Sequence, residues 1–308
     1  MRRKTRIPPA PLPQREGVDP VRVRLPADGA WPTVRDHLVE RLAAGPGVID
    51  AMLRDGRIVG ADGVPVAPDA PYAPGAFLWF HRDLPPEVPV PFALDVVHRD
   101  EHIVVVDKPH FLATMPRGGH VTQTALARLR TDLGIPTLSA AHRLDRLTAG
   151  LLLFTVRPDE RGAYQTLFRD RRVHKEYEAI APYDPGVSLP RTVRSHIVKE
   201  RGVLAAYEVE DAEPNSESHV ELVEVRGDLG RYRLTPRTGR THQLRVHMNA
   251  LGLPILGDPL YPVVTGPAAP DDFRRPLQLL ARVLEFTDPV TGHPHRFVSG
   301  RTLAAWSV

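Results

Sequence analysis

A short apolar run preceded by charged residues constrains the fold of this chain more than any other segment. Residues 150–154 read Gly-Leu-Leu-Leu-Phe, and a short, glycine-bounded apolar run of this kind predicts a buried β-strand instead of a helix. The residues just before this run include Arg143 and Asp145. In an extended backbone, side chains two residues apart leave the same side of the chain. We therefore expect a basic and an acidic group on one wall of a cleft, at the edge of a core.

The composition excludes several classes of protein. The chain of 308 residues holds no cysteine, which excludes disulfides, thiolate catalysis and cysteine-ligated metal centres. Its apolar runs are too short for a membrane span or for the core of a signal peptide, so we expect a cytoplasmic protein with no membrane partner. A formal net charge of +3 and a pI near 9.3 make the chain mildly basic. This basicity alone is weak support for nucleic-acid binding.

The first part of the chain divides into three segments. Residues 1–30 are basic and proline-rich, which predicts a poorly ordered arm. Residues 31–82 are expected to form a small module, with helices over 34–42 and 48–53 and a short strand at 57–59. Residues 83–97 contain four prolines and predict a linker. The main domain is therefore expected over residues 98–308.

The main domain is expected to mix helices and strands. The apolar pattern predicts helices over 124–133 and 159–168, and it predicts strands over 102–107, 150–156, 175–181, 219–226 and 231–235. The two kinds of element follow one another without strict βαβ order. This order indicates an α+β domain, in which helices flank a mixed sheet.

Residues 241–251 predict a further, amphipathic helix. Thr241 is a plausible cap and Gly252 a plausible end of this helix. One face would carry His242, Arg245 and Asn249, which are spaced to form a polar stripe. This stripe either points into a cleft or forms an ordinary solvated face.

Two pairs of histidines are poor matches to a metal site. His242 and His247 are five residues apart, which separates their side chains by about 140° on a helix, and His293 and His295 flank a proline. Neither pair has a nearby carboxylate to complete a ligand set. The chain also lacks the glycine-rich loops that bind dinucleotides or nucleoside triphosphates. We therefore expect neither a metal nor a cofactor.

Five segments, in order along the chain, resemble motifs of the RluA-type RNA pseudouridine synthases. They read VDKP (106–109), HRLDRLTAGLLLFT (142–155), HKEY (174–177), LTPRTGRTHQLRVH (234–247) and LPILGDPLY (253–261). The resemblance covers roughly residues 95 to 300, and agreement at this many ordered places is far more specific than any single short motif. One departure is Thr148-Ala149-Gly150, where the family usually has Thr-Ser-Gly. A second is His110, which begins a stretch without the glycine that commonly follows the Lys-Pro pair.

The resemblance implies a fold and a reaction. It implies a long, mixed, mainly antiparallel sheet with a central RNA-binding cleft, the pseudouridine synthase fold. Residues 31–82 are similar to the small RNA-binding module named after ribosomal small-subunit protein four, in a degenerate form. The implied reaction breaks the N1–C1′ bond of a uridine, turns the base and joins C5 to C1′, without a cofactor. Asp145 would be the essential carboxylate, acting either by attack at the sugar or by taking a ribose proton.

The resemblance also implies roles for further residues. Arg245 would pair with Asp145 and favour its ionised form. Tyr177 would stack on the base and help to remove the C5 proton. Arg143 would enter the RNA and support a nucleotide flipped out of its stack. The residues expected to bind the RNA backbone are Arg146, Lys108, Lys175 and Arg240.

The expected partner is RNA, with ribosomal RNA preferred over transfer RNA, and the chain is expected to act as a monomer. The sequence leaves two other classes open. One is a catalytically inactive RNA-binding or ribosome-assembly protein with the same fold. The other is a glycoside or nucleoside hydrolase, which needs a second carboxylate beside Asp145. The matched motifs offer no evident partner of that kind.

Overall fold

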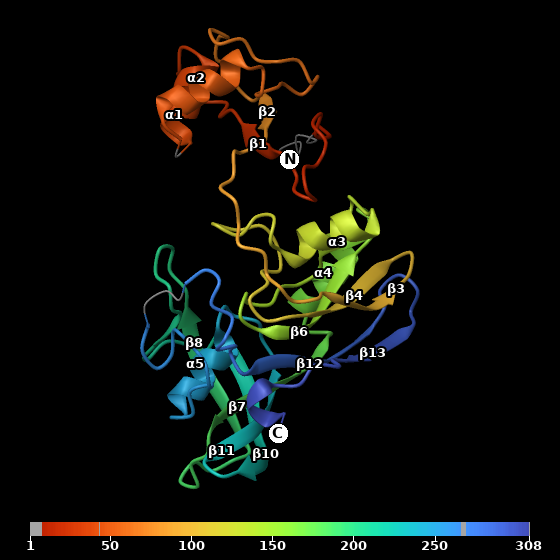
Figure 1. Cartoon of the computed structure of the whole chain (residues 1–308), viewed down its shortest axis with the longest axis vertical. Coiled ribbons are helices and arrows are strands. Elements are labelled where there is room, and N and C mark those ends of the chain that lie inside the picture. The colour runs from red at the N-terminus through yellow and green to blue at the C-terminus, as the bar shows by residue number, and fades with distance from the viewer. Residues whose placement is uncertain (1–7, 43, 266–268, 308) are drawn as a thin grey trace. The chain divides into compact units, whose positions relative to one another are not determined.

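The computed structural model describes residues 8–42, 44–265 and 269–307, which fall into two compact units (Figure 1). The first unit ends at Pro86 and the second begins at Glu87. The first residues of the expected N-terminal arm, 1–7, lie outside the described residues.

Two helices and a two-stranded ribbon build the first unit. The helices are α1 (Val34–Arg41) and α2 (Pro46–Arg54), close to the expected positions. The ribbon pairs β1 (Val21–Arg24) with β2 (Phe77–Phe80). Residues 21–24 are therefore a strand, whereas the sequence predicted a poorly ordered arm, because the partner strand lies more than fifty residues away in the sequence. The strand expected at 57–59 is reduced to isolated bridges of Val59 with Pro65 and Trp79.

The proline-rich stretch is not a free linker over its whole length. From Glu87 onward it belongs to the second unit. The Glu87 carboxylate accepts hydrogen bonds from the backbone N–H groups of Val121, Thr122 and Gln123. Val90 is buried in the core of that unit. This part of the stretch is fixed because its carboxylate satisfies loop donors and its apolar residue is removed from water.

The second unit is built on a mixed sheet of eleven strands. Its main path runs β3-β4-β6-β12-β7-β11-β10-β8-β9, while β13 pairs with β12 and β5 with β6. The strands are β3 (Asp95–Arg99), β4 (Ile103–Lys108), β5 (Ser139–Ala140), β6 (Ala149–Thr155), β7 (His174–Pro182), β8 (Arg191–Val198), β9 (Tyr207–Val209), β10 (Ser216–Arg226), β11 (Leu229–Pro236), β12 (Leu279–Thr287) and β13 (Pro294–Val298). The β6–β12 pair is parallel, and the other pairs among the described residues are antiparallel. The expected mixed, mainly antiparallel sheet is therefore confirmed.

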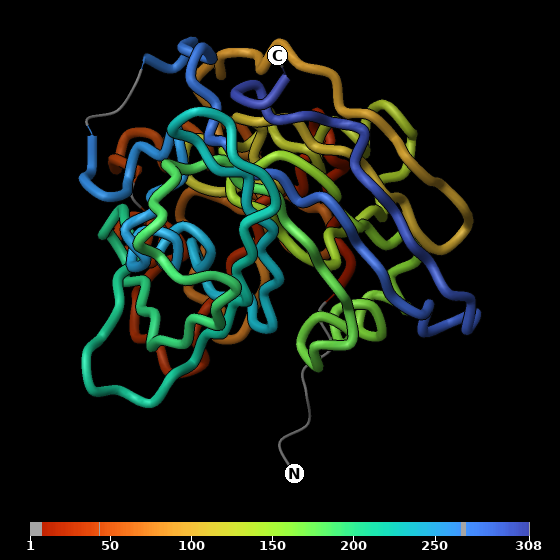
Figure 2. Tube along the Cα trace, turned by 90° about the horizontal axis from the view of Figure 1, so that it is seen from below, coloured from red at the N-terminus to blue at the C-terminus, as the bar shows by residue number. Residues whose placement is uncertain are grey.

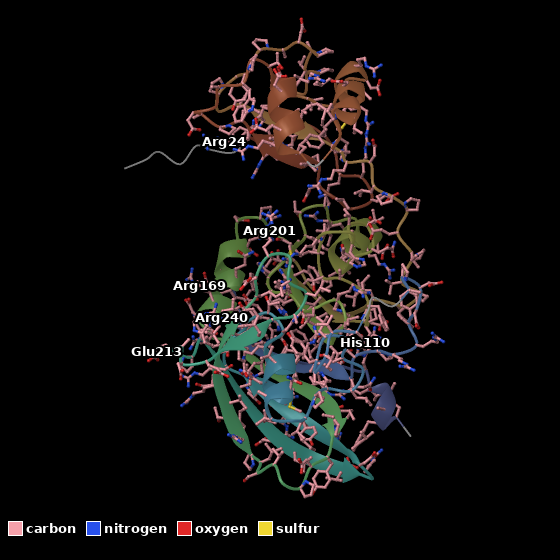
Figure 3. All side chains as sticks on the ribbon, turned by 90° about the vertical axis from the view of Figure 1, so that its left-hand side faces the viewer. Arg24, His110, Arg169, Arg201, Glu213 and Arg240 are labelled. Atoms are coloured by element: carbon pink, nitrogen blue, oxygen red, sulfur yellow. The ribbon has the colours of Figure 1, made fainter. Side chains whose placement is uncertain are left out.

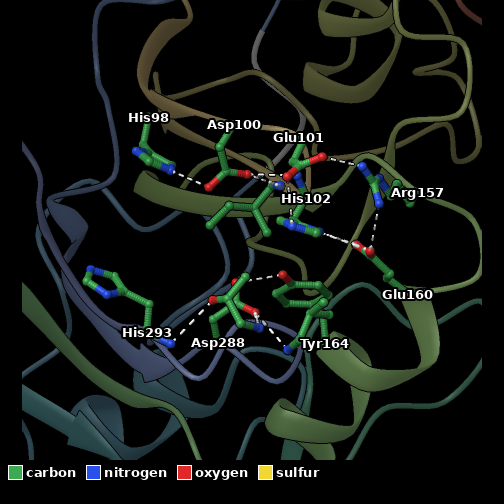
Figure 4. Close-up of polar contacts among 12 residues, drawn as sticks. His98, Asp100, Glu101, His102, Arg157, Glu160, Tyr164, Asp288 and His293 are labelled. Carbon is green, nitrogen blue, oxygen red and sulfur yellow. Dashed lines mark hydrogen bonds and ion pairs between the residues drawn. The ribbon is translucent and has the colours of Figure 1, made fainter.

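Helices flank this sheet, as predicted. They are α3 (Ala125–Leu133), α4 (Arg161–Arg169) and α5 (Gln243–Ala250), with a short 3₁₀ turn, η1 (Ala304–Trp306), near the C-terminus. Polar contacts hold α4 to the sheet (Figure 4). Tyr164 donates to Asp288, just after β12, at 2.7 Å, and Glu160 lies 3.0 Å from His102, just before β4.

The apolar run noted in the sequence is β6, and all seven of its residues are buried. Leu152 and Phe154 pack into one hydrophobic cluster, while Leu151 and Leu153 pack into another. The strand is buried on both faces, which explains why it is apolar throughout instead of alternating. Figure 2 shows the Cα trace of the whole chain, turned by 90° from the view of Figure 1. The polar loop that contains Asp145 runs from β5 into β6, so the buried strand β6 fixes where this loop ends.

Candidate active site

A cleft of about 580 Å³ lies where four segments of the second unit meet. These segments are the loop before β6, the region from α4 to β7, the loop after β11, and α5. Of the eight residues proposed from the sequence, six line this cleft: Asp145, Tyr177, Arg245, Arg143, Lys175 and Arg240. Arg146 and Lys108 are not among the lining residues.

The loop that carries Asp145 is held by the segment that follows β4. Thr114 Oγ1 donates to the carbonyl of Leu144 at 2.8 Å and accepts from its N–H at 3.1 Å. On the other side of Asp145, the imidazole of His110 lies 2.7 Å from the carbonyl of Leu147. The backbone is thus held on both sides of a carboxylate whose side chain is 23% exposed.

Lys108 supports the same loop, and this differs from the expected contact with the RNA backbone. Its side chain is fully buried. Its Nζ donates to the carbonyls of Pro109, Leu112 and Arg146 at 2.8 to 3.3 Å. Burial lowers the pKa of Lys108 to about 7, against the attraction of the nearby Asp145. A buried ammonium with three backbone acceptors is not available to a phosphate, so the structure makes Lys108 a support of the Asp145 loop.

Arg245 lies between two carboxylates. Its Nη1 is 3.4 Å from Asp145 Oδ2, while Nε and Nη2 each donate to an oxygen of Asp258 at 2.7 Å. The side chain of Asp258 is fully buried and that of Arg245 is 3% exposed. Burial opposes the charge of Arg245, but the bonds to Asp258 and the charge of Asp145 outweigh it and raise the pKa. A fixed cation therefore stands beside Asp145.

His242 faces Asp145 from the start of α5. It directly precedes the helix with a left-handed φ of 60°, so His242 and not the expected Thr241 occupies the cap position. Its Nε2 is 3.9 Å from Asp145 Oδ2, and its Nδ1 is 3.0 Å from the hydroxyl of Tyr261. Burial lowers the pKa of His242, although Asp145 acts in the opposite direction. Asn249, the third member of the predicted polar stripe, does not line the cleft.

Tyr177 contributes its ring to the cleft from β7. The strand lies between β11 and β12, where Tyr177 is opposite Leu234 and Ala281. Burial first, and then the charge of Asp145, raise the pKa of Tyr177 far above its usual range. The phenol therefore keeps its proton, and the residue offers an aromatic face and a hydrogen-bond donor.

Basic side chains surround the entrance of the cleft. Arg143 and Arg240 are exposed, and Nε of Arg240 donates to the carbonyl of Asn215 at 3.1 Å. Figure 3 shows Arg169 and Arg240 on the same side of this unit, and both line the cleft. Lys175 is partly buried, which lowers its pKa. These residues give the cleft a cationic rim, which suits a polyanion.

Arg146 contacts the segment that follows β4 and does not line the cleft. Its Nη1 is 3.4 Å from the carbonyl of Phe111, and burial lowers its pKa. The family resemblance implied a contact with the RNA backbone. In the structure the guanidinium lies near the Phe111 carbonyl, and the carbonyl of Arg146 accepts from Lys108.

Three residues of the site had no assigned role in the sequence analysis, namely His242, Asp258 and Tyr261. Asp258 and Tyr261 stand in the LPILGDPLY segment, which was matched as a motif without a stated function. The ring of Tyr261 lies over the guanidinium of Arg245, with 5.3 Å between Arg245 Cζ and the ring centroid. Asp258 is a second carboxylate near Asp145, but it does not meet the requirement of a hydrolase for a second carboxylate in the cleft. Its side chain is buried, bound to Arg245 on both oxygens, and absent from the cleft lining.

Within residues 8–42, 44–265 and 269–307, no three or more His, Asp or Glu side chains are grouped so that they could hold a metal ion. The helices of the same residues are too short or too polar to cross a membrane. The pairs His242/His247 and His293/His295 therefore lack a third ligand in the part of the chain described.

Known proteins resemble this chain in sequence and in fold. A family model described as RNA pseudouridylate synthase matches residues 102–250. The chain is 37% identical over 214 residues to the dual-specificity RNA pseudouridine synthase RluA of Pasteurella multocida, which covers 64% of this chain and 89% of that protein. It is 33% identical over 213 residues to the ribosomal large subunit pseudouridine synthase D of Pseudomonas aeruginosa, covering 65% of each chain.

A solved structure agrees. The human RNA pseudouridylate synthase domain containing 4 superposes with a TM-score of 0.51 at 25% identity, over 68% of this chain and 88% of that one. The sequence and the fold are thus those of a pseudouridine synthase, an isomerase that acts on RNA. This chain belongs to the RluA-type RNA pseudouridine synthase family.

Proposed function

We propose that Asp145 is the carboxylate that starts the isomerisation, and that the target uridine lies in ribosomal RNA, with transfer RNA as the second substrate class. One observation carries the assignment of Asp145. Its carboxylate is partly exposed in the cleft and lies 3.4 Å from a buried, doubly anchored arginine. An anion held in this way is ready to act at the sugar of a bound nucleotide.

The reaction changes the atom through which the base is attached to the sugar, from N1 to C5. The N1–C1′ bond breaks, the base turns, and C5 bonds to C1′. Asp145 either attacks the sugar or takes a ribose proton, and both routes need its ionised form near C1′. Arg245 holds this carboxylate in place, because its guanidinium is itself fixed by two hydrogen bonds to Asp258. The face of Tyr177 would hold the base by stacking while it turns.

The target base has to leave its stack to reach this carboxylate. The flipped base leaves a gap in the RNA stack, and we assign Arg143 to this gap. Its side chain is exposed at the cleft, and its planar guanidinium can stack on a base or bind a phosphate. Arg240 and Lys175 line the same cleft and would contact phosphates. Arg146 lies outside the cleft lining, so it would contact the RNA backbone only if the RNA extends beyond the cleft.

The names of the relatives support the proposed RNA class. One is a dual-specificity RNA enzyme and another is a large-subunit ribosomal enzyme. We further propose that the protein works as a monomer in the cytoplasm. Size-exclusion chromatography with light scattering tests the oligomeric state.

Mapping of pseudouridines in cellular RNA tests the proposed substrate. Ribosomal and transfer RNA would be compared with and without this gene, and after complementation with the wild type or Asp145→Asn. We expect at least one site, in ribosomal RNA, to disappear without the gene and to return only with the wild type. A complete set of pseudouridines in both RNA classes without the gene would refute the proposed targets.

A further inference from the structure

We infer that His242 is a further catalytic residue, whose Nε2 takes the proton that leaves C5 once the new carbon–carbon bond has formed. The inference rests on the proposed role of Asp145, because that role places C1′ of the target sugar beside this carboxylate. Both residues line the cleft, and His242 Nε2 is 3.9 Å from Asp145 Oδ2. A base joined to C1′ would therefore have its ring atoms within reach of Nε2.

Hydrogen bonds fix which nitrogen of His242 is free to accept a proton. The hydroxyl of Tyr261 donates its single proton to the carbonyl of Ala206 and accepts from the N–H of the same residue, both at 2.8 Å. It can therefore interact with His242 Nδ1, 3.0 Å away, only as an acceptor. The neutral imidazole must carry its proton on Nδ1. Nε2, on the Asp145 side of the ring, then presents a lone pair.

The charges around His242 keep this lone pair available. Burial is the main cause that lowers its pKa, and the cations Arg245 and Lys199 add to it. The carboxylates of Asp145 and Asp258 act in the opposite direction without reversing the shift. The residue also stands at the N-terminal end of α5, where the helix dipole disfavours a positive charge. His242 is therefore neutral at neutral pH, as a proton acceptor has to be.

Tyr177, which the family resemblance implied for the same proton, is less suited to accept it. A protonated phenol is a donor and a very weak base, and only its phenolate would remove a proton readily. The burial of Tyr177 and the nearby charge of Asp145 oppose the phenolate. This leaves Tyr177 to hold the base and gives the proton transfer to His242.

The proposed step balances without an added reagent. After C5 has bonded to C1′, the C5–H bond breaks and its electron pair returns to the ring, while the proton moves to His242 Nε2. N1 holds the electron pair of the broken glycosidic bond. It takes a proton from the imidazolium, directly or through water, which restores neutral His242. The product is an isomer of the substrate, as the established activity requires.

The variant His242→Asn removes the proposed proton acceptor and keeps the structural contacts of this residue. Asparagine tolerates the left-handed backbone found at this position. Its Nδ2 can donate to Tyr261 in place of His242 Nδ1, but it has no group that takes a proton at the place of Nε2. We expect kcat to fall about 100-fold or more, as for loss of a general base. The Kd for RNA and the melting temperature should stay near the wild-type values.

A matched control is His196→Asn. His196 lies on β8, outside the cleft lining, and its Nδ1 contacts the carbonyl of Glu213 at 2.7 Å. This variant should keep the wild-type kcat. A drop like that of His242→Asn in the control would attribute the loss to a general effect of the substitution and overturn the inference.

Two readouts separate proton transfer from structural support. RNA with deuterium at C5 of the target uridine should react markedly more slowly than normal RNA in His242→Asn, because removal of this hydrogen becomes limiting. In the wild type the difference should be small. The wild-type kcat should also fall with decreasing pH as His242 becomes protonated, below the usual histidine range, and this contribution should be absent from His242→Asn.

The inference is overturned if His242→Asn turns over RNA at close to the wild-type rate, or if it is slow without an isotope effect. Should the variant fail to fold, ¹⁵N NMR of histidine-labelled wild type still decides. A proton on Nδ1 of His242 at neutral pH supports the inference and a proton on Nε2 contradicts it. Activity of Asp145→Asn in the same assay would instead refute the proposed role of Asp145.

Discussion

At the scale of single residues, the geometry around Asp145 depends on a carboxylate that lies outside the cleft. Asp258 accepts from Nε and Nη2 of Arg245, the two nitrogens that do not face Asp145, and its side chain is fully buried. A buried ion pair of this kind fixes the orientation of the guanidinium more than it stabilises the fold. Substitutions of Arg245 and Asp258 should therefore affect stability and activity differently.

Arg245→Met would leave Asp258 buried without a charged partner. Loss of one member of a buried pair typically lowers the free energy of unfolding by about 3 to 5 kcal/mol. The double variant Arg245→Met/Asp258→Leu should regain most of this stability and still turn over no RNA, since the guanidinium that contacts Asp145 is lost. Urea unfolding and tritium release from 5-tritiated RNA measure the two effects. A double variant with near wild-type turnover would show that Asp145 does not need the cation.

The sequence could indicate which residues of the site are charged, but not which of them are buried. Asp145 and Arg245 were found because each stands in a long motif. Lys108 and Arg146 were expected to bind the RNA backbone on the family resemblance, which does not show how the loop after β4 packs against them. Asp258 had no assigned role, because its partner is set by how the loop after α5 folds back onto the helix.

At the scale of elements, Gly150 shows why the second residue of β6, the strand after Asp145, is glycine. Its φ is 110°, and a Cβ atom here would lie 2.3 Å from the carbonyl oxygen of Ala281, on the parallel strand β12. Alanine would therefore force β6 and β12 apart next to the Asp145 loop. The apolar pattern predicted the strand itself, since residues buried on both faces have to be apolar. It could not predict the close approach of β12, which is distant in sequence.

We expect Gly150→Ala to lower the free energy of unfolding by about 3 kcal/mol, through backbone strain and a steric clash. It should also reduce turnover, because the Asp145 loop is displaced. Gly162→Ala, in α4 with no atom within 4 Å of the added Cβ, is the control. It should be neutral or more stable by up to about 1 kcal/mol. Equal stability of the two variants in thermal unfolding would contradict the packing described here.

The contribution of Lys108 to the free energy of unfolding should depend on pH. Its pKa is about 7 in the folded chain, against an ordinary value of 10.5. Between these values the unfolded chain binds more protons than the folded chain, so the contribution of Lys108 to stability rises with pH. The unfolding free energy of the wild type minus that of Lys108→Met should therefore become more positive from pH about 7 to about 10. Chemical unfolding across this range measures it, and a difference independent of pH would argue against a lowered pKa.

At the scale of the whole molecule, all residues assigned to the reaction lie in the second unit, residues 87–308. The sequence predicts an N-terminal module apart from the main domain, with a linker over residues 83–97, and residues 87–97 of that linker belong to the second unit. Composition identifies proline-rich segments but does not show whether their apolar residues are packed. The module itself has exposed arginines on β1, Arg22 and Arg24, with the ring of Phe77 6.0 and 5.6 Å away.

A chain of residues 87–308 should fold cooperatively and keep the turnover of bound RNA, because it retains its own core and the complete cleft. Calorimetry and single-turnover kinetics on a short stem-loop would test this. The salt dependence of RNA binding, compared with the full chain, reports whether the first unit contacts phosphates. Loss of single-turnover activity in a folded fragment would mean that the first unit contributes to the chemistry.

The most direct test of the whole proposal is the purified Asp145→Asn enzyme in the tritium-release assay, with a folded RNA that carries 5-tritiated uridine. The change keeps the shape of the side chain and removes its charge. We predict that the variant melts like the wild type, binds RNA with similar affinity and releases no tritium above background. Release at close to the wild-type rate would contradict the assignment of Asp145 as the essential carboxylate.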